Sequence, residues 1–509
     1  MSIPGKIVNR KIGLVNSKNV NEQNPVQFQK ATLLKLLNTA KKTEIGKYYH
    51  FDKITSFDEF QNAVPIHDYN KMYDEWWHKS LAGEQNIAWP GTVPFFALSS
   101  GTSGAPSKYI PVTKDMQKAM RQSSLGILAS VNKFKMPISK LVKQWLMIGG
   151  SASLTKYNNS LVGDLSGING RKPPLWIRRF KKPELATTML PTWEERAEMI
   201  VKNAEKWNIS VVSGIPSWVQ LILEKIVDHY QIENIRELWP DLSLFVTGGI
   251  NLEPYKENLE NIIGGSMMYI DTYLASEGFF AFQNCPERDD MSLLFNAGIF
   301  YEFIPFNDDN FDEVGMVKEG TKAYTIDEVE EDIDYAMVIS TCAGAWRYLI
   351  GDNVKFTDKT LGKIKITGRT QHFLSVCGEH LSVENMNDAV CNVKEKLDLD
   401  LREFSVGVIP KNNHFAHEWF IGSDATIDNE MVARNLDKEL KRLNDDYQAE
   451  RGAMLQPPIV HIIPNDWFYE WTKLRGKMNG QSKVSRVVKG SNQAEWQKFV
   501  ESKRTALLI

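Results

Sequence analysis

The chain alternates helical patterns with short apolar runs between residues 192 and 278, and this alternation restricts the possible fold more than any other sequence feature. The apolar runs are typical of strands, and polar residues follow each of them. These polar segments are Ser213-Gly214, Thr247-Gly248-Gly249 and Tyr273 to Gly278. Strands that alternate with helices predict βαβ units and a mainly parallel sheet. Because ligands of such sheets bind beyond the carboxyl ends of the strands, the three segments are candidates for one binding site.

The rest of the chain divides into helical and antiparallel patterns. Thr192 and Glu195 form the T-x-x-E pattern of a capping box, so a helix is expected to begin there. Further helical patterns cover residues 25–50, 113–130 and 218–227. Residues 292–305 and 335–350 look like antiparallel strands. After Arg369 the pattern changes to an α+β tail of about 140 residues, which is long enough to form its own domain.

The tail combines helical and strand patterns. We expect a helix near residues 382–397, strands near 405–409 and 418–422, and an amphipathic helix that carries Leu436, Leu440, Leu443 and Tyr447 on one face. The tail also contains His414 and His417, whose spacing would suit metal binding on a helix. No third ligand is evident, so we do not expect a metal site there.

Charge and cysteine usage exclude several classes of protein. The net charge of the 509 residues is only −3, so nucleic-acid binding by a generally basic surface is not expected. The four cysteines are scattered without a C-x-x-C pair, which argues against a zinc site and a disulfide framework. No signal peptide is visible, and no apolar run approaches about 18 residues. We therefore expect a cytoplasmic protein without a membrane span.

The segment LSSGTSGAPSKYIP, residues 98–111, concentrates hydrogen-bond donors between a strand-like run and a helical pattern. The polar and glycine residues of interest are Ser99, Ser100, Gly101, Thr102, Ser103 and Lys108. The segment does not match the Walker A pattern, because Tyr109 follows Lys108 and the glycines are too close together. Its glycines, hydroxyl groups and lysine nevertheless suit a phosphate group. A surface turn rich in serine and glycine explains the composition equally well.

Three further motifs are compatible with nucleotide chemistry, and each also has a simpler explanation. Glu277 follows a strand and would suit Mg²⁺ beside phosphate oxygens, although a solvated loop carboxylate is commoner. Asp352 in YLIGD would accept hydrogen bonds from a ribose diol, or it would lie in a Gly-Asp hairpin turn. Lys483 lies in a glycine-flanked segment near the C-terminus, where it would reach a phosphate or remain in solvent.

The order of these motifs resembles that of the adenylate-forming superfamily: a Ser/Thr/Gly-rich loop, YLASEG, YLIGD, Gly368-Arg369 and a late lysine. Within it, SSGTSGAPSKYIP and VTGGINLEPYKENLE are most similar to the acyl acid–amido synthetases, the auxin-responsive promoter family. The resemblance covers residues 90 to 490 approximately, and we expect a bacterial-type member. It implies that ATP and Mg²⁺ are required.

The resemblance also assigns roles to individual residues. Lys483, Glu277 and Lys108 would be catalytic, and Glu277 would also bind Mg²⁺. The nucleotide-binding residues would be Ser99, Ser100, Gly101, Thr102, Ser103, Lys108, Thr247, Gly248, Gly249, Tyr273, Ser276, Asp352 and Arg369. Arg121 would bind the carboxylate of the substrate.

The implied fold is α/β with two domains. Residues 1–370 would form a large adenylate-forming domain, with mainly parallel sheets flanked by helices and a small antiparallel barrel-like part. Residues 371–509 would form a smaller, mobile α+β domain that rotates about a hinge near residues 369–371.

The implied activity is an ATP-dependent ligase that adenylates a small carboxylic acid and transfers the acyl group to the amine of an amino acid. The expected partners are these two small molecules, without nucleic acid or membrane, and the chain would be a monomer or weak homodimer. A ligase that forms coenzyme A thioesters and a nucleotide-binding sensor without turnover remain alternatives.

Overall fold

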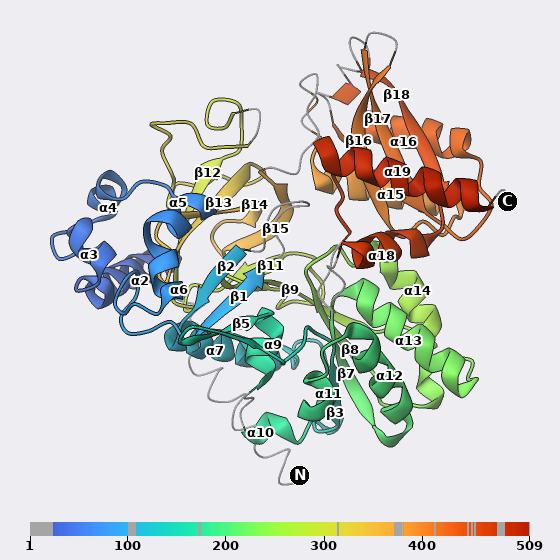
Figure 1. The fold of residues 1–509 in the computed structure, drawn as a ribbon, viewed down its shortest axis with the longest axis horizontal. Helices are drawn as coiled ribbons and strands as arrows, with labels where there is room; N and C mark the ends of the chain where they lie inside the picture. Colours follow the sequence, from blue (N-terminus) through green and yellow to red (C-terminus); the bar gives the residue numbers. More distant parts are fainter. Residues whose placement is uncertain are drawn as a thin grey trace.

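Figure 1 shows the fold in a computed structural model. The structure describes residues 24–99, 108–171, 175–312, 315–370, 379, 381–411, 414–444, 447–448, 451, 455–475 and 484–507. A large N-terminal part surrounds one long sheet, and a smaller C-terminal part, drawn in orange and red, packs beside it (Figure 1). In the described part of the chain, no helix combines the length and the apolar character that a membrane crossing requires.

The long sheet has eleven strands among the described residues, and half of it is parallel. Its order is β12-β13-β14-β15-β11-β10-β9-β8-β7-β3-β6, and the strands from β9 to β6 run parallel. The parallel strands are β3 (Gln144–Met147), β6 (Lys181–Lys182), β7 (Ile209–Gly214), β8 (Leu244–Gly248) and β9 (Met268–Ala275). The alternation of helices and strands after residue 192 therefore has the predicted structure.

Three helices cover one face of the parallel strands. They are α12 (Trp193–Asn203), α13 (Pro216–Tyr230) and α14 (Glu253–Ile263). The predicted capping box is formed, because the Glu195 amide donates to Thr192 Oγ1 at 3.2 Å while the Thr192 amide donates to Glu195 Oε2 at 3.2 Å. Trp218 of α13 and Phe245 of β8 are buried in the core between these layers.

Helices on the opposite face pack against the antiparallel half of the sheet. They include α2 (Pro25–Ala40) and α7 (Lys114–Ser130), both within predicted helical segments. Gln29 of α2 fixes one contact, because its Nε2 donates to the Ile299 carbonyl at 3.1 Å and its Oε1 accepts from the Tyr301 amide at 2.8 Å. Gly126 allows α7 to approach β10, since a Cβ at this position would lie 3.3 Å from the Phe282 ring.

The antiparallel strands continue the parallel strands in the same sheet. They are β10 (Gly278–Phe282), β11 (Met291–Leu293), β12 (Ile299–Pro305), β13 (Asp334–Thr341), β14 (Tyr348–Asp358) and β15 (Lys363–Arg369). The predicted antiparallel pairing is found between β12 and β13. The single strand expected over 335–350 is instead two strands, because residues 342–347 turn the chain from β13 into β14.

A second sheet carries the serine- and glycine-rich segment. Its order is β2-β1-β5-β4, formed by β1 (Phe95–Ser99), β2 (Lys108–Val112), β4 (Thr155–Tyr157) and β5 (Ser160–Gly163). Ser99 lies directly opposite Lys108 in the antiparallel β1–β2 pair. The segment therefore connects two strands of a hairpin rather than a strand and a helix, and α7 follows the second strand.

The C-terminal part has its own sheet and its own cores. The sheet contains β16 (Phe404–Lys411), β17 (His414–Gly422) and β18 (Leu455–Ile463), and the helices are α15 (Val383–Leu397), α16 (Asn429–Leu443), α18 (Asn465–Leu474) and α19 (Gly490–Leu507). Its two buried clusters contain only residues from Leu381 onward. The boundary predicted at residue 370 stays a prediction, because residues 371–378 lie outside the described part.

The histidine pair of this part lies on a strand, not on a helix. His417 is buried on β17, and its Nε2 lies 2.8 Å from Glu379 Oε1. Because β17 is a strand, the helical geometry in which this spacing would suit a shared metal ion is not formed here.

Several polar contacts connect the two parts. The Tyr255 hydroxyl of α14 donates to Glu403, which lies next to β16. Nearby, Asn258 Nδ2 donates to Asp400 Oδ1 at 2.9 Å. On α18, Lys473 Nζ lies 2.6 Å from Glu194 Oε1 of α12. The C-terminal part is thus held against α12 and α14.

A buried ion pair ties the N-terminal helices to the antiparallel strands. The side chains of Glu302 on β12 and Arg347 are 0% and 5% exposed, and Arg347 Nε donates to Glu302 Oε1 at 2.9 Å. Arg347 Nη1 also donates to the carbonyls of Gln61 and Val64, at 3.1 and 2.8 Å. Burial raises the pKa of Glu302, and the charge and hydrogen bond of Arg347 oppose this shift.

We expect Arg347→Met to lower the free energy of unfolding by about 3–5 kcal/mol, because Glu302 would remain buried without a counter-charge. Urea denaturation followed by tryptophan fluorescence measures the change. The double variant Glu302→Leu/Arg347→Met should recover much of the loss. As a control, Lys322→Met disrupts an ion pair with side chains 59% and 36% exposed, and it should change stability little. Equal effects of Arg347→Met and Lys322→Met would contradict the prediction.

Candidate active site

A cleft of about 2490 Å³ lies at the carboxyl ends of the parallel strands. The ends of β7, β8 and β9 line it, as do β15 and the first turns of α15 from the C-terminal part. The predicted site residues that the structure describes all line this cleft. They are Ser99, Lys108, Arg121, Thr247, Gly248, Gly249, Tyr273, Ser276, Glu277, Asp352 and Arg369.

Asp352 is fixed by two donors from different strands. It lies on β14 directly opposite Arg369 of β15, and Arg369 Nε donates to Asp352 Oδ1 at 2.7 Å. The Tyr273 hydroxyl of β9 donates to Asp352 Oδ2 at 2.7 Å. The Asp352 carboxylate raises the pKa of Arg369, and burial raises that of Tyr273. This cluster joins the parallel and antiparallel halves of the sheet at the cleft.

Glu277 lies in the turn that connects β9 to β10. The residue is only 8% exposed, and the Tyr348 hydroxyl donates to Glu277 Oε1 at 3.4 Å. Burial raises the pKa of this carboxyl group, with the Asp352 charge acting in the same direction, while Lys108 and Arg369 oppose the shift. Glu277 is therefore a buried carboxyl group with two cations near it.

Lys108 is the first residue of β2 and completes the cluster. Burial lowers the pKa of its amine, whereas the charges of Glu277 and Asp352 raise it. Its Nζ also lies 5.3 Å from the centre of the Tyr69 ring, within the range of a cation–π contact. Two cationic and two carboxyl side chains from distant parts of the sequence are thereby brought together.

The end of β8 approaches β9 closely. Thr247 is 1% exposed, and the Thr272 hydroxyl donates to its carbonyl at 2.7 Å. A Cβ at Gly248 would lie 2.5 Å from the Thr272 carbonyl oxygen, so only glycine fits there. Gly249 has a φ of +88°, which glycine adopts without strain. The two glycines of the T-G-G sequence are therefore required by the backbone where it lines the cleft.

The structure describes only some of the remaining predicted residues. Ser276 is half-buried in the β9–β10 turn. Arg121 is exposed on α7 and faces the cleft. Ser100, Gly101, Thr102, Ser103 and Lys483 lie outside the described residues. The functional roles assigned to all of these residues stay predictions.

Asp271 is a cleft residue that the sequence did not single out. It lies on β9 two residues before Tyr273, and burial raises the pKa of its carboxyl group to about 7. The Thr272 amide donates to Asp271 Oδ1 at 2.8 Å. Asp271 follows an apolar run and precedes YLASEG in the sequence, and this position was the available signal. The sequence does not show, however, that the Asp271 carboxylate is buried.

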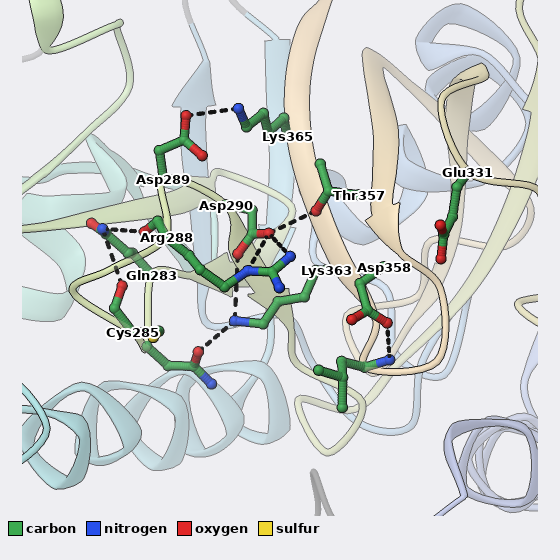
Figure 2. Close-up of polar contacts among 12 residues, drawn as sticks. Gln283, Cys285, Arg288, Asp289, Asp290, Glu331, Thr357, Asp358, Lys363 and Lys365 are labelled. Atoms are coloured by element: carbon green, nitrogen blue, oxygen red, sulfur yellow. Dashed lines mark hydrogen bonds and ion pairs between the residues drawn. The ribbon is translucent and has the colours of Figure 1, made fainter.

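A charged cluster on the rim of the cleft was also missed. Figure 2 shows Asp290 in contact with Arg288, Thr357 and Lys363, and Asp289 paired with Lys365. Arg288 Nε donates to Asp290 Oδ2 at 2.8 Å, and Lys365 Nζ donates to Asp289 Oδ2 at 2.7 Å. These residues come from β14, from β15 and from the segment before β11. Strand pairing brings these three segments close together.

Three family models match separate stretches of the chain. The GH3 family N-terminal domain matches residues 19–156, the GH3 family central domain matches residues 292–369, and the GH3 family C-terminal domain matches residues 384–492. The three matches are in chain order and together cover more than half of the sequence.

Curated relatives agree with these matches. The indole-3-acetic acid-amido synthetase GH3.2 of Arabidopsis thaliana is 27% identical over 437 residues, which are 73% of this chain and 78% of the relative. Several other relatives align over 50% of this chain and only 45% of their own length, so the chain spans about half of those proteins. The expectation of a bacterial-type member stays a prediction.

Solved structures share the fold. The GH3.15 acyl acid amido synthetase superposes with a TM-score of 0.79 at 16% identity, covering 96% of both chains. A 2-hydroxyisobutyryl-CoA ligase in its postadenylation state superposes with a TM-score of 0.56 at 11% identity, covering 93% of this chain and 91% of the ligase. The predicted α/β fold with a large N-terminal and a smaller C-terminal part is therefore confirmed.

Replacing Asp271 by asparagine should stabilise the protein at pH 8 but not at pH 4. Below its ordinary pKa of 3.8 the carboxyl group is protonated in both the folded and the unfolded states. Between this value and about 7 the unfolded state loses the proton first, so wild-type stability falls as the pH rises. The asparagine side chain cannot ionise, and the gain at pH 8 should be on the order of a few kcal/mol.

Urea denaturation at the two pH values measures this difference. The matched control is Asp309→Asn, which makes the same chemical change at an exposed position outside the cleft and should show no pH-dependent gain. The same stabilisation by Asp271→Asn at pH 4 and pH 8 would contradict the assignment.

Proposed function

The chain belongs to the GH3 family, and on this premise we propose that it is an acyl acid amido synthetase. This ligase uses ATP to adenylate a small carboxylic acid and then transfers the acyl group to the amine of an amino acid. The names of its relatives support amide formation, since they are amido synthetases. The acid substrate of this chain is left open, because indole-3-acetic acid appears only in the names of those relatives.

One observation carries this proposal: Lys108, Glu277, Asp352 and Arg369 gather in one cleft at the carboxyl ends of parallel strands. Open α/β sheets bind their ligands at such a position. A nucleotide requires cationic donors for its phosphates and acceptors for its ribose hydroxyl groups. The cluster offers both kinds of group within a space large enough for a nucleotide and an organic acid.

The individual roles follow from the chemistry of these side chains. We assign the ribose diol to Asp352, whose two oxygens are already oriented by Arg369 and Tyr273. The adenine would lie beside Thr247, Gly248 and Gly249, which line the cleft at the end of β8. The phosphates would meet Lys108 and the segment from Ser99 to Ser103.

The side chains in the cleft suit a magnesium ion that is bound jointly by a carboxylate and by the phosphates of a nucleotide. Mg²⁺ commonly takes one or two carboxylates and completes its shell with water and phosphate oxygens. Glu277 would be that carboxylate, and among the described residues no cluster of three or more His, Cys, Asp or Glu side chains would hold the ion alone. When bound, the ion would neutralise negative charge that develops on pyrophosphate.

The reaction has two steps, and the chain's own residues act in both. In the first, a substrate carboxylate oxygen bonds to the α-phosphorus of ATP and the bond to pyrophosphate breaks. Lys108 would balance the developing charge, and Arg121 would orient the carboxylate. In the second, the amine nitrogen bonds to the acyl carbon, the bond to the AMP oxygen breaks, and the amine loses a proton.

Residues 371–509 would form the mobile domain that serves the two steps in turn. Lys483 would approach the phosphates during adenylation, when the domain adopts the required orientation. We also retain a cytoplasmic location and a monomer or weak homodimer as predictions from the sequence.

Lys108→Met should lower the rate of acid-dependent ATP–pyrophosphate exchange by roughly 100- to 1000-fold, since a preorganised charge would be lost from the transition state. Exchange with radioactive pyrophosphate over a panel of aryl and alkyl acids measures the rate. Lys71→Met is the matched control, because Lys71 is exposed on α5 (Tyr69–Met72), away from the cleft. Exchange by Lys108→Met at the wild-type rate would refute its role.

Asp352→Ala should weaken ATP binding at least about tenfold, because the ribose hydroxyl groups would lose a charged acceptor. Calorimetric titration with ATP measures the affinity, and thermal unfolding verifies that the variant is folded. Unchanged affinity would exclude Asp352 as the ribose ligand.

The acceptor is tested separately: thioester formation with coenzyme A, and no amide with any amino acid, would favour the alternative ligase.

A further inference from the structure

A row of side chains crosses the parallel strands and ends at a lysine on the edge strand. Strand pairing places four residues side by side in this row: Leu244 of β8, Val211 of β7, Trp145 of β3 and Lys181 of β6. Side chains at paired positions of neighbouring strands point to the same face of a sheet, and all four residues line the cleft. The row is therefore apolar on three strands and cationic on the fourth.

The helices that cover this face add further apolar side chains to the cleft. They are Ile127 and Leu128 of α7, Val131 just after it, and Ile177 of α10 (Leu175–Arg178), and they pack in the same apolar cluster as Trp145. From β8, beside which the adenine would lie, to β6 there are three strand spacings, or about 14 Å. A hydrocarbon chain would suit this part of the cleft, because it would be buried between apolar walls.

Within the described part of the chain, Lys181 is a cation without a counter-charge. The residue is half-buried, and its Nζ donates to the Gly170 carbonyl at 3.2 Å. Burial lowers the pKa of its amine, and no charged side chain among the described residues shifts this pKa in either direction. One carbonyl satisfies only one of the three ammonium donors, and a buried charge is costly unless it is paired. An anion beside Lys181 would supply the partner that the protein does not.

Two arginines extend the positive charge beyond Lys181. Arg171, the last residue of α9 (Leu165–Arg171), and Arg178, the last residue of α10, line a recess of about 480 Å³. The recess shares Gly170 and Lys181 with the cleft, so the two spaces adjoin at the lysine. Neither arginine makes a hydrogen bond or an ion pair with another described residue.

The carboxylates nearby are already balanced by other cations. Among the described residues that line the recess, Glu184 is the one carboxylate, and it pairs with Lys182. In the cleft, burial raises the pKa of Asp164, and the charge of Arg196 opposes this shift. The three residues between α9 and α10 are a lysine and two prolines, so they add no carboxylate. Positive charge therefore predominates where the apolar row ends.

We propose that this end of the cleft binds a second carboxylate of the acid substrate, which would then be a dicarboxylic acid with a hydrocarbon chain between its two carboxyl groups. The inference rests on the proposed function and deepens it, because it names the class of acid. The reacting carboxylate would lie at the nucleotide, the chain along Val211 and Trp145, and the distal carboxylate at Lys181. An acid that ends in a methyl group would leave the lysine unpaired.

A solvated basic surface accounts for only part of this arrangement. Arg178 and the adjacent Arg179 are exposed, and water alone would solvate them. Lys181 is different, because it is half-buried and lies at the end of an apolar row. A second explanation is that Lys181 binds the reacting carboxylate itself, and the experiment below separates that role from the proposed one.

The test compares two series of acids in ATP–pyrophosphate exchange by the full-length protein. One series contains the straight-chain dicarboxylic acids from adipic to dodecanedioic acid, and the other contains the monocarboxylic acids of the same chain lengths. We expect kcat/KM for the best dicarboxylic acid to exceed that of its monocarboxylic counterpart at least about tenfold, because a charge-assisted hydrogen bond to Lys181 is gained.

Lys181→Met should remove this preference, because methionine keeps an apolar stem of similar length without the charge. Its kcat/KM should fall at least about tenfold for the dicarboxylic acid and change little for the monocarboxylic one. The ratio of the two values in one preparation is a readout that a folding defect would not change. Lys225→Met is the matched control, because Lys225 is exposed on α13 and lines neither the cleft nor the recess.

Equal kcat/KM values for the two series in the wild-type protein would overturn the inference. So would a Lys181→Met variant that still prefers the dicarboxylic acid. Equal losses for both series in that variant would also overturn it, since the lysine would then act on the reacting carboxylate. A wild-type protein that exchanges pyrophosphate with no acid of a broad panel would instead overturn the proposed function itself.

Discussion

The paired side chains of Asp352 and Arg369 determine how the rest of the cleft is organised. The two residues lie opposite each other on adjacent antiparallel strands, and the Tyr273 hydroxyl reaches the same carboxylate from β9. Because β9 is where parallel pairing changes to antiparallel pairing, this contact fixes the two halves of the sheet relative to each other. A charged hydrogen bond in a cleft is also well suited to hold one orientation of a carboxylate.

Charge balance explains why so many ionisable groups are tolerated in this region. Lys108 and Arg369 oppose the cost of burying Glu277 and Asp352, so no single group carries an uncompensated charge. A bound polyanion would add negative charge, and the proposed magnesium ion would offset it.

The sequence was sufficient to predict β7, β8 and β9 and the position of the cleft, because glycine and polar residues mark the ends of these three strands. The parallel strands β3 and β6 were not predicted. It also predicted that Asp352 and Arg369 belong to the site, although only through the order of motifs. Their direct pairing depends on strand register and on bulges in β14–β15, which no local pattern specifies. The β1–β2 hairpin was missed because Lys108 to Val112 is short and contains Pro111. Asp271 was missed because its burial results from tertiary packing.

The interface between the two parts of the molecule combines a buried polar contact at Tyr255 with exposed ion pairs. The Tyr255 hydroxyl is deeply buried against Glu403, whereas the Lys473–Glu194 pair has side chains 62% and 50% exposed. Dissolved ions weaken the exposed attraction and leave the apolar cores intact. A rise in ionic strength would therefore weaken the Lys473–Glu194 contact first and leave the buried Tyr255–Glu403 contact largely unaffected.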